Sequence, residues 1–152
     1  MSHNGTILLV EDNRYDEELT LAAFNENRIS NQFIVARDGE AALDYIFGTG
    51  RYEGRDIKDL PQLILLDLKL PKVDGLEVLQ QLRADKRTQF IPVVILTSSK
   101  EQEDLIKGYT YGCNAYIRKP VDFAQFGEAV RALGLFWTVY NESAYESAKQ
   151  YN

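Results

Sequence analysis

The chain has 152 residues, of which 45% are hydrophobic and 26% are charged. This size and composition predict a single globular domain with a sizeable core. The formal net charge of −6 argues against direct binding of nucleic acid, which requires a basic face. No run of about 18 apolar residues occurs, so we expect neither a membrane-spanning helix nor a membrane partner. The N-terminus shows no pattern of a signal peptide, and we expect a cytoplasmic protein.

The cysteine and histidine content excludes several kinds of site. The single cysteine, Cys113, excludes an internal disulfide, and we expect it to be a buried small residue rather than a reactive thiol. The only histidine is His3, close to the N-terminus. The chain therefore has almost none of the residues that a Ser-His-Asp or Cys-His arrangement, or a histidine-rich metal site, would need.

Short apolar runs alternate with segments of helical period along the whole chain. The predicted strands are residues 6–10, 32–36, 63–67, 92–97 and 115–118. The predicted helices follow them, at about residues 15–27, 39–47, 76–85, 101–111 and 123–140. This alternation predicts an α/β fold, a doubly wound parallel sheet with helices on both faces. Residues 48–62, "GTGRYEGRDIKDLPQ", have no clear period and read as a surface insertion, most simply a solvated loop.

Polar residues stand where four of the predicted strands end. They are Glu11 and Asp12 after the first strand, Asp67 at the end of the third, Thr97 at the end of the fourth, and Lys119 after the fifth. In a doubly wound sheet, ligands bind beyond the carboxyl ends of the strands. We therefore expect these side chains to converge on one pocket.

The chemistry of such a pocket suits a cation and a phosphoryl group. At about 4 Å, with an effective dielectric constant near 20, each pair of carboxylates repels by about 4 kcal/mol. Mg²⁺ prefers oxygen ligands and would offset that repulsion, while Lys119 supplies a further positive charge. A carboxylate such as Asp67 can also act as a nucleophile and form an aspartyl phosphate. The Lys119 ammonium and the Thr97 hydroxyl could then face the phosphoryl oxygens.

Simpler interpretations exist for each residue alone. Asp67 could cap a helix or form a turn, Thr97 could cap the next helix, and Lys119 could be a solvated lysine. Their joint occurrence at the ends of neighbouring strands favours a shared site.

Other functional classes fit the sequence less well. A flavodoxin-like cofactor carrier would share the fold but needs a loop of Gly, Ser and Thr after the first strand, where this chain has "EDNRYD". A phosphatase with an aspartate nucleophile usually has a second acid two residues later, where Lys69 stands. A histidine phosphotransfer protein needs a histidine on a helical face, which His3 does not provide.

These motifs resemble the receiver domain of two-component response regulators over about residues 6–133. The resemblance is carried by "LLVEDN", "LLDLKLPKVDG", "VVILTSS" and "AYIRKP". It implies a flavodoxin-like five-stranded sheet with strand order 2-1-3-4-5, in one receiver domain spanning 1–152. The intervals between Asp67, Thr97 and Lys119 match the usual spacing of the family. The interval from Asp12 to Asp67 is longer, and the insertion 48–62 accounts for it.

The resemblance also implies roles for the acidic residues. Asp67 accepts a phosphoryl group from a sensor histidine kinase. Asp12, Asp67 and the backbone carbonyl of Lys69 bind Mg²⁺, and Glu11 assists through water. Such a protein is a signalling phosphoacceptor that catalyses only its own phosphorylation and dephosphorylation. Lys69 departs from the uncharged residue common at this position, which puts a typical rate of phosphate loss in doubt.

A conformational switch is implied by the same resemblance. Thr97 moves toward the phosphoryl group and the ring of Tyr116 turns inward. Without the family, Tyr116 would be only an aromatic on an edge strand, for which core packing is the better interpretation. The Lys119–Pro120 bond is expected to be cis, which helps to aim Lys119 inward.

The C-terminal part narrows the resemblance and suggests an interface. The insertion 48–62 and the segment "LGLFWTVYN" (133–141) resemble the small stand-alone regulators that are paired with bacterial phytochromes, with no output domain after about Tyr140. One stripe of the last predicted helix would face the sheet, which leaves Leu135, Phe136 and Val139 exposed in a monomer. We expect a symmetric homodimer through these three residues, the alternative being that the tail folds back over them.

Overall fold

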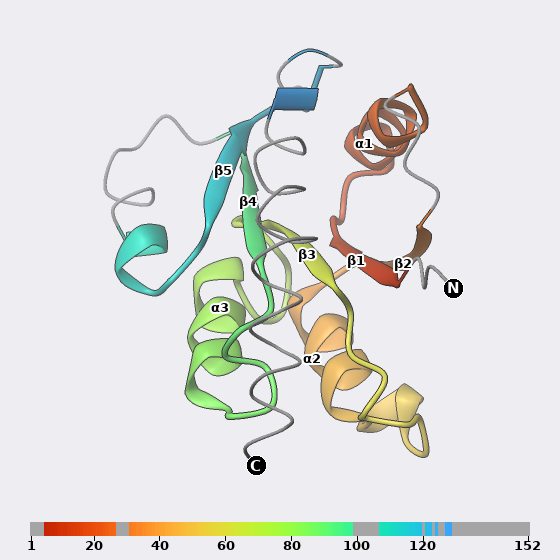
Figure 1. The fold of residues 1–152 in the computed structure, drawn as a ribbon, viewed down its shortest axis with the longest axis vertical. Coiled ribbons are helices and arrows are strands. Elements are labelled where there is room, and N and C mark those ends of the chain that lie inside the picture. Colours follow the sequence, from red (N-terminus) through yellow and green to blue (C-terminus); the bar gives the residue numbers. More distant parts are fainter. Residues whose placement is uncertain are drawn as a thin grey trace.

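The architecture is a five-stranded parallel sheet with helices on both faces (Figure 1). The computed structural model describes residues 5–26, 31–98, 107–119, 121–122, 124 and 127–128. The sheet has the order β2-β1-β3-β4-β5. Its strands are β1 (Thr6–Val10), β2 (Gln32–Ala36), β3 (Leu63–Asp67), β4 (Val93–Thr97) and β5 (Ala115–Arg118). The helices are α1 (Arg14–Glu26), α2 (Gly39–Phe47), α3 (Gly75–Ala84) and the short 3-10 helix η1 (Gly50–Tyr52). The predicted fold class and strand order are confirmed.

The alternation of side chains along β1 divides the core into two layers. Ile7 and Leu9 pack with Phe24 of α1, whereas Leu8 and Val10 pack with residues of α2 and α3. Figure 1 accordingly shows α1 on one side of the sheet and α2 and α3 together on the other. β3 and β4 are buried along their whole length, as expected for central strands of a doubly wound sheet.

The predicted elements agree with the structure to within about one residue wherever both can be compared. β4 begins at Val93 rather than at residue 92, because Pro92 has no backbone N–H to donate to the sheet. Residues 107–110 are helical, within the helix predicted for 101–111. Most of the helix predicted for 123–140 lies outside the described residues, as do the tail and the residues of the expected dimer interface. No described helix is both long enough and apolar enough to cross a membrane.

The insertion 48–62 is fastened to the end of α2 and is more than a solvated loop. Arg55 donates hydrogen bonds to the backbone oxygens of Tyr45 at 2.5 Å and of Asp59 at 2.8 Å. Its guanidinium also stacks on the ring of Tyr45, 4.1 Å from the centroid. One arginine therefore binds carbonyl groups at the C-terminus of α2 and in the insertion itself, which the charge-rich sequence alone did not reveal.

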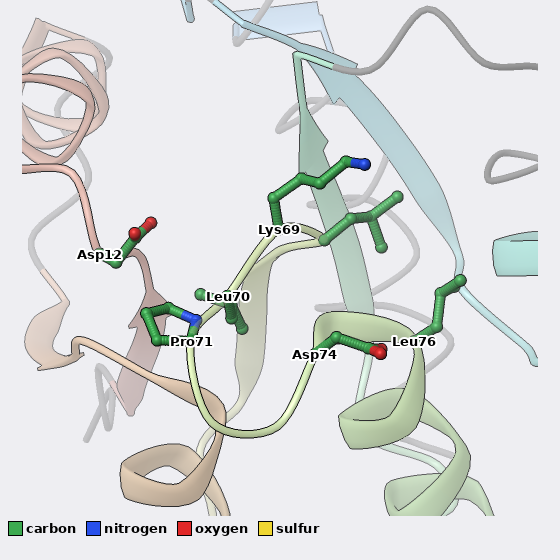
Figure 2. A pocket seen from close by; sticks show the side chains of 7 residues that line it. Asp12, Lys69, Leu70, Pro71, Asp74 and Leu76 are labelled. Atoms are coloured by element: carbon green, nitrogen blue, oxygen red, sulfur yellow. The ribbon is translucent and has the colours of Figure 1, made fainter.

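The turn between β3 and α3 is shaped by a cap and a close backbone contact. Asp74 caps α3, because its Oδ1 accepts a hydrogen bond of 3.0 Å from the backbone N–H of Glu77. A Cβ atom on Gly75 would lie 2.3 Å from the carbonyl oxygen of Asp67, so only glycine fits there. The turn borders a pocket of about 430 Å³, which Asp12 also lines (Figure 2).

Candidate functional site

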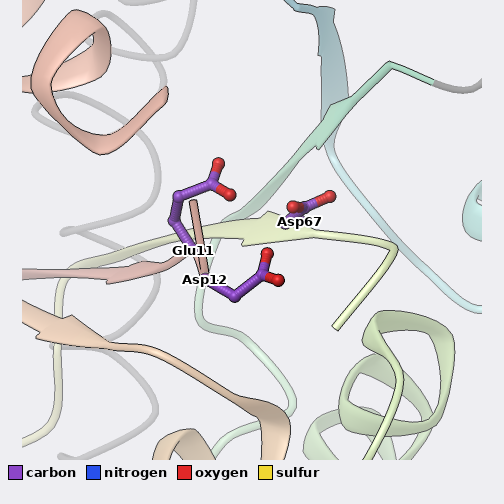
Figure 3. Close-up of side chains that lie close together, drawn as sticks. All are labelled: Glu11, Asp12 and Asp67. Carbon is purple, nitrogen blue, oxygen red and sulfur yellow. The ribbon is translucent and has the colours of Figure 1, made fainter. Parts of the chain in front are cut away.

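Three carboxylates converge at the carboxyl edge of the sheet. Glu11 and Asp12 directly follow β1, and Asp67 is the last residue of β3. One oxygen of each lies within 4.8 Å of the others (Figure 3). Glu11 is 0% and Asp67 4% exposed, whereas Asp12 is open to solvent. The structure thus brings together the three acids that the sequence placed at these strand ends.

Lys119 directly follows the edge strand β5, two strands from β3, and its side chain reaches this cluster. Its backbone N–H donates to the Thr97 carbonyl at 2.9 Å, which continues the β4–β5 pairing one residue beyond β5. Its Nζ lies 2.6 Å from Glu11 Oε1 and 2.9 Å from Asp67 Oδ2. The side chain is only 9% exposed. The interpretation of Lys119 as a solvated lysine is therefore wrong.

Asp16 is a fourth acid at the site, which the sequence analysis missed. Its Oδ2 lies 3.0 Å from the Nζ of Lys119. Asp16 stands in the first turn of α1, and that turn begins at the same edge of the sheet as the strand ends. Its place at the start of the predicted helix was the available signal, but an acid in a first turn is ordinarily explained by the helix dipole alone.

The electrostatics of the site are dominated by burial and by an excess of negative charge. Burial raises the pKa of Glu11 to about 7, although the Lys119 ammonium opposes this shift and the nearby Asp67 charge adds to it. Burial alone would lower the pKa of Lys119, but hydrogen bonds to Glu11 and Asp67 raise it above its usual value. When all are ionised, the four carboxylates carry four negative charges against the single positive charge of Lys119.

The donor set fits a hard divalent cation. All three clustered groups offer carboxylate oxygens, the ligands that Mg²⁺ prefers. Asp67 Oδ1 also accepts a hydrogen bond of 3.2 Å from the backbone N–H of Lys69, which holds the carboxylate in place. The Lys69 side chain lines the pocket beside the cluster, with its amine pointing away from Asp12 (Figure 2). A cation bound here would offset the repulsion that Lys119 only partly cancels.

The two residues expected to form a switch occupy different environments. Thr97 is completely buried at the end of β4, on the strand next to β3. Tyr116 is 38% exposed on the edge strand β5, and its ring packs edge-on against Tyr109, with centroids 6.0 Å apart. Core packing of Tyr116 is therefore wrong for this conformation. Pro120, and with it the expected cis bond, lies outside the described residues.

Comparison with known proteins identifies the family. Residues 7–131 match the response regulator receiver domain. The chain belongs to this family. It is accordingly a response regulator of two-component phosphorelay signalling, in which the receiver domain is the phosphoacceptor.

Several relatives match the chain over most of its length. The probable methanogenesis regulatory protein FilR2 of Methanothrix harundinacea is 41% identical over 90% of this chain and 86% of its own. Response regulator Rcp1 of Synechocystis is 37% identical over 86% of this chain and 87% of its own. The solved structure of the bacteriophytochrome response regulator RtBRR is 53% identical, covers 90% of this chain and 82% of its own, and superposes with a TM-score of 0.80.

Proposed function

We propose that Asp67 is the residue that receives the phosphoryl group. One observation carries the proposal: Asp67 is buried at the end of β3, with Oδ2 2.9 Å from the Lys119 ammonium and with oxygens of Glu11 and Asp12 beside it. A buried carboxylate with a fixed cation and two further acids suits nucleophilic attack on phosphorus, with charge neutralisation from both sides.

In the reaction, an Asp67 carboxylate oxygen attacks the phosphorus of a phosphohistidine on the kinase. The new O–P bond forms as the P–N bond breaks, and the leaving imidazole keeps the electron pair and takes up a proton. Lys119 remains directed at the growing negative charge, and the Thr97 hydroxyl at the neighbouring strand end donates to a phosphoryl oxygen. The chain thereby catalyses its own phosphorylation, and its own dephosphorylation when water attacks instead.

Mg²⁺ is the proposed cofactor, held by Asp12, Asp67 and the backbone carbonyl of Lys69, with Glu11 assisting through water. When bound, it would neutralise charge on the phosphoryl oxygens. The oxygen donor set of the described cluster supports this assignment. A solved Mn²⁺-bound form of Rcp1, 36% identical over 90% of this chain and 96% of its own with a TM-score of 0.74, supports a divalent cation in a related protein.

We propose a phytochrome-type histidine kinase as the phosphodonor and a cytoplasmic location, without nucleic acid or membrane as direct partners. Two related proteins support the choice of kinase: RtBRR is a bacteriophytochrome response regulator, and RcpA, 36% identical with a TM-score of 0.74, is a phosphorylated cyanobacterial phytochrome response regulator.

We propose that the conformational switch acts through Thr97 and Tyr116, and that the Tyr116 ring leaves Tyr109 and turns inward. The proposed homodimer uses Leu135, Phe136 and Val139, which lie outside the described residues.

The phosphoacceptor assignment is tested with acetyl phosphate, Mg²⁺ and intact mass. The wild type should gain one phosphoryl group that hydroxylamine removes, and Asp67→Asn should gain none. Asp74→Asn is the matched control, because it neutralises an acid at the same edge of the sheet that serves as a helix cap. A phosphoryl group that is still added to Asp67→Asn in full would refute the assignment of Asp67 as the phosphoacceptor.

The partners need separate experiments. Transfer from a purified, autophosphorylated phytochrome-type kinase should be faster than transfer from a histidine kinase of another class at the same concentration, and equal rates would refute the choice of donor. Sedimentation equilibrium should show a wild-type dimer at micromolar concentration and a Phe136→Glu monomer. A wild-type monomer, with and without a phosphoryl mimic, would rule the dimer out.

A further inference from the structure

The Lys119 ammonium is held by three carboxylates from three different elements. It carries three N–H donors. Its Nζ lies 2.6 Å from Glu11 Oε1, 2.9 Å from Asp67 Oδ2 and 3.0 Å from Asp16 Oδ2. These acceptors come from the end of β1, the end of β3 and the first turn of α1. Its hydrogen bonds to Asp67 and Asp16, together with the ion pair to Glu11, constrain the orientation of the ammonium.

Asp16 differs from the other two acids in its surroundings. It is not one of the three described residues whose oxygens cluster within 4.8 Å as a candidate cation site. Its own backbone is fixed, because its N–H donates to Asn13 Oδ1 at 2.9 Å at the start of α1. Its side chain is 26% exposed, in contrast to the fully buried side chain of Glu11. Asp16 is therefore an acceptor whose backbone is held at the start of α1 and whose described partner in the site is Lys119.

We propose that Asp16 is a positioning residue for phosphotransfer, which holds Lys119 so that one N–H stays directed at Asp67. This inference rests on the proposed function of Asp67. Without the Asp16 acceptor, the ammonium has a free donor and can turn toward solvent or deeper toward Glu11. The phosphoryl oxygens would then meet a less well oriented cation, and orientation errors of this kind slow reactions strongly.

Asp16 also has an effect through charge alone, which the experiment must separate from positioning. Its negative charge lies close to the carboxylate cluster of Glu11, Asp12 and Asp67, and should strengthen Mg²⁺ binding there. Asp16→Asn removes the charge but keeps an oxygen acceptor for Lys119, whereas Asp16→Ala removes both. The two variants should therefore weaken Mg²⁺ binding equally, by roughly fivefold for one charge several ångströms from a divalent ion in a wet environment.

The test compares wild type, Asp16→Asn, Asp16→Ala and the control Glu18→Ala, which removes an exposed acid from the same helix. Phosphorylation by acetyl phosphate is followed at limiting and at saturating Mg²⁺, and Mg²⁺ affinity is measured by calorimetry. At saturating Mg²⁺ we expect Asp16→Ala to be slower by about tenfold. Under the same condition, Asp16→Asn and Glu18→Ala should stay within about twofold of wild type. If Asp16→Ala does not fold, Asp16→Ser replaces it, because the serine hydroxyl is too short to reach Lys119.

Three results would overturn the inference. Asp16→Ala could react at the wild-type rate at both Mg²⁺ concentrations, Asp16→Asn could be slowed as much as Asp16→Ala at saturating Mg²⁺, or Asp16→Ala could be slow at limiting Mg²⁺ and normal at saturating Mg²⁺. The first result would exclude any role of Asp16 in phosphotransfer. The second would show that Asp16 acts through its charge alone, and the third that it acts only by raising the affinity for Mg²⁺. A wild type that takes up no phosphoryl group refutes the proposed function instead, so the two failures are distinguishable.

Discussion

Two aspartates at the same edge of the sheet, Asp67 and Asp74, have opposite kinds of partner. Asp74 is exposed and accepts a hydrogen bond from the backbone N–H of Glu77, three residues further along the chain. Asp67 is 4% exposed, and its Oδ2 depends on Lys119, 52 residues away. Asp74 is therefore a helix cap at the start of α3, and the interpretation of Asp67 as a helix cap is wrong.

The difference lies in how each carboxylate is compensated. A helix offers N–H groups that need an acceptor, so an acid at its start adds stability. Asp67 meets other carboxylates instead, and one ammonium must serve several of them. We therefore expect substitutions at the cap to change mainly stability, and substitutions in the cluster to change mainly the response to cations and phosphoryl donors.

The largest expected effect is stabilisation by Mg²⁺. Binding to the native state alone raises the free energy of unfolding by RT ln(1 + [L]/Kd), about 2.7 kcal/mol at one hundred times Kd. Asp12→Ala should lose most of this Mg²⁺-dependent stabilisation, because it removes an exposed carboxylate from the cluster of Glu11, Asp12 and Asp67. Asp74→Ala should keep it. Urea unfolding with and without Mg²⁺ measures the difference, and a wild type indifferent to Mg²⁺ would count against a metal site.

The second prediction concerns Gly75, which lies between the two aspartates in space. In Gly75→Ala the new Cβ would lie 2.3 Å from the Asp67 carbonyl oxygen and 2.7 Å from the Cα of Leu68. Both are backbone atoms, so β3 and α3 must move apart. We expect a loss of about 2 kcal/mol in the free energy of unfolding, typical of overpacking. Mg²⁺ affinity should fall as well, because the shift displaces Asp67; unchanged affinity and stability would contradict the contact.

A smaller effect is expected from the cap itself. Asp74→Ala should lower the free energy of unfolding by about 1 kcal/mol, whereas Asp74→Asn should retain most of the stability. Phosphorylation of Asp67 should proceed in both. Asp38→Ala is a matched substitution, since Asp38 caps α2 by accepting from Ala41. Urea midpoints check the stabilities, and a cap variant that abolished phosphorylation would remove the distinction between the two acids.

Sequence reasoning located the carboxyl edge of the sheet well, because that edge follows from the ends of the strands. Glu11, Asp67 and Lys119 stand at such ends, and the short apolar runs that precede them are easy to recognise. Asp16 and Arg55 were missed for a physical reason. Asp16 acts from the first turn of a helix and Arg55 from an irregular segment, and there the direction of a side chain depends on packing that no local pattern encodes.

The smallest predicted effect comes from Lys69, two residues beyond Asp67. Its backbone N–H donates to Asp67 Oδ1, and its exposed side chain lines the adjoining pocket. Once Asp67 carries a phosphoryl group, the long cationic side chain can turn to pair with its oxygens and obstruct the approach of water. Lys69→Ala should therefore lose phosphate about threefold faster than wild type, an effect of about 0.6 kcal/mol on the barrier. Lys69→Met keeps the length without the charge, so an intermediate rate would assign part of the effect to obstruction. Phosphate release is followed after removal of acetyl phosphate. An unchanged or slower rate in Lys69→Ala would refute the prediction, because the cation would then be idle or would help to orient the attacking water.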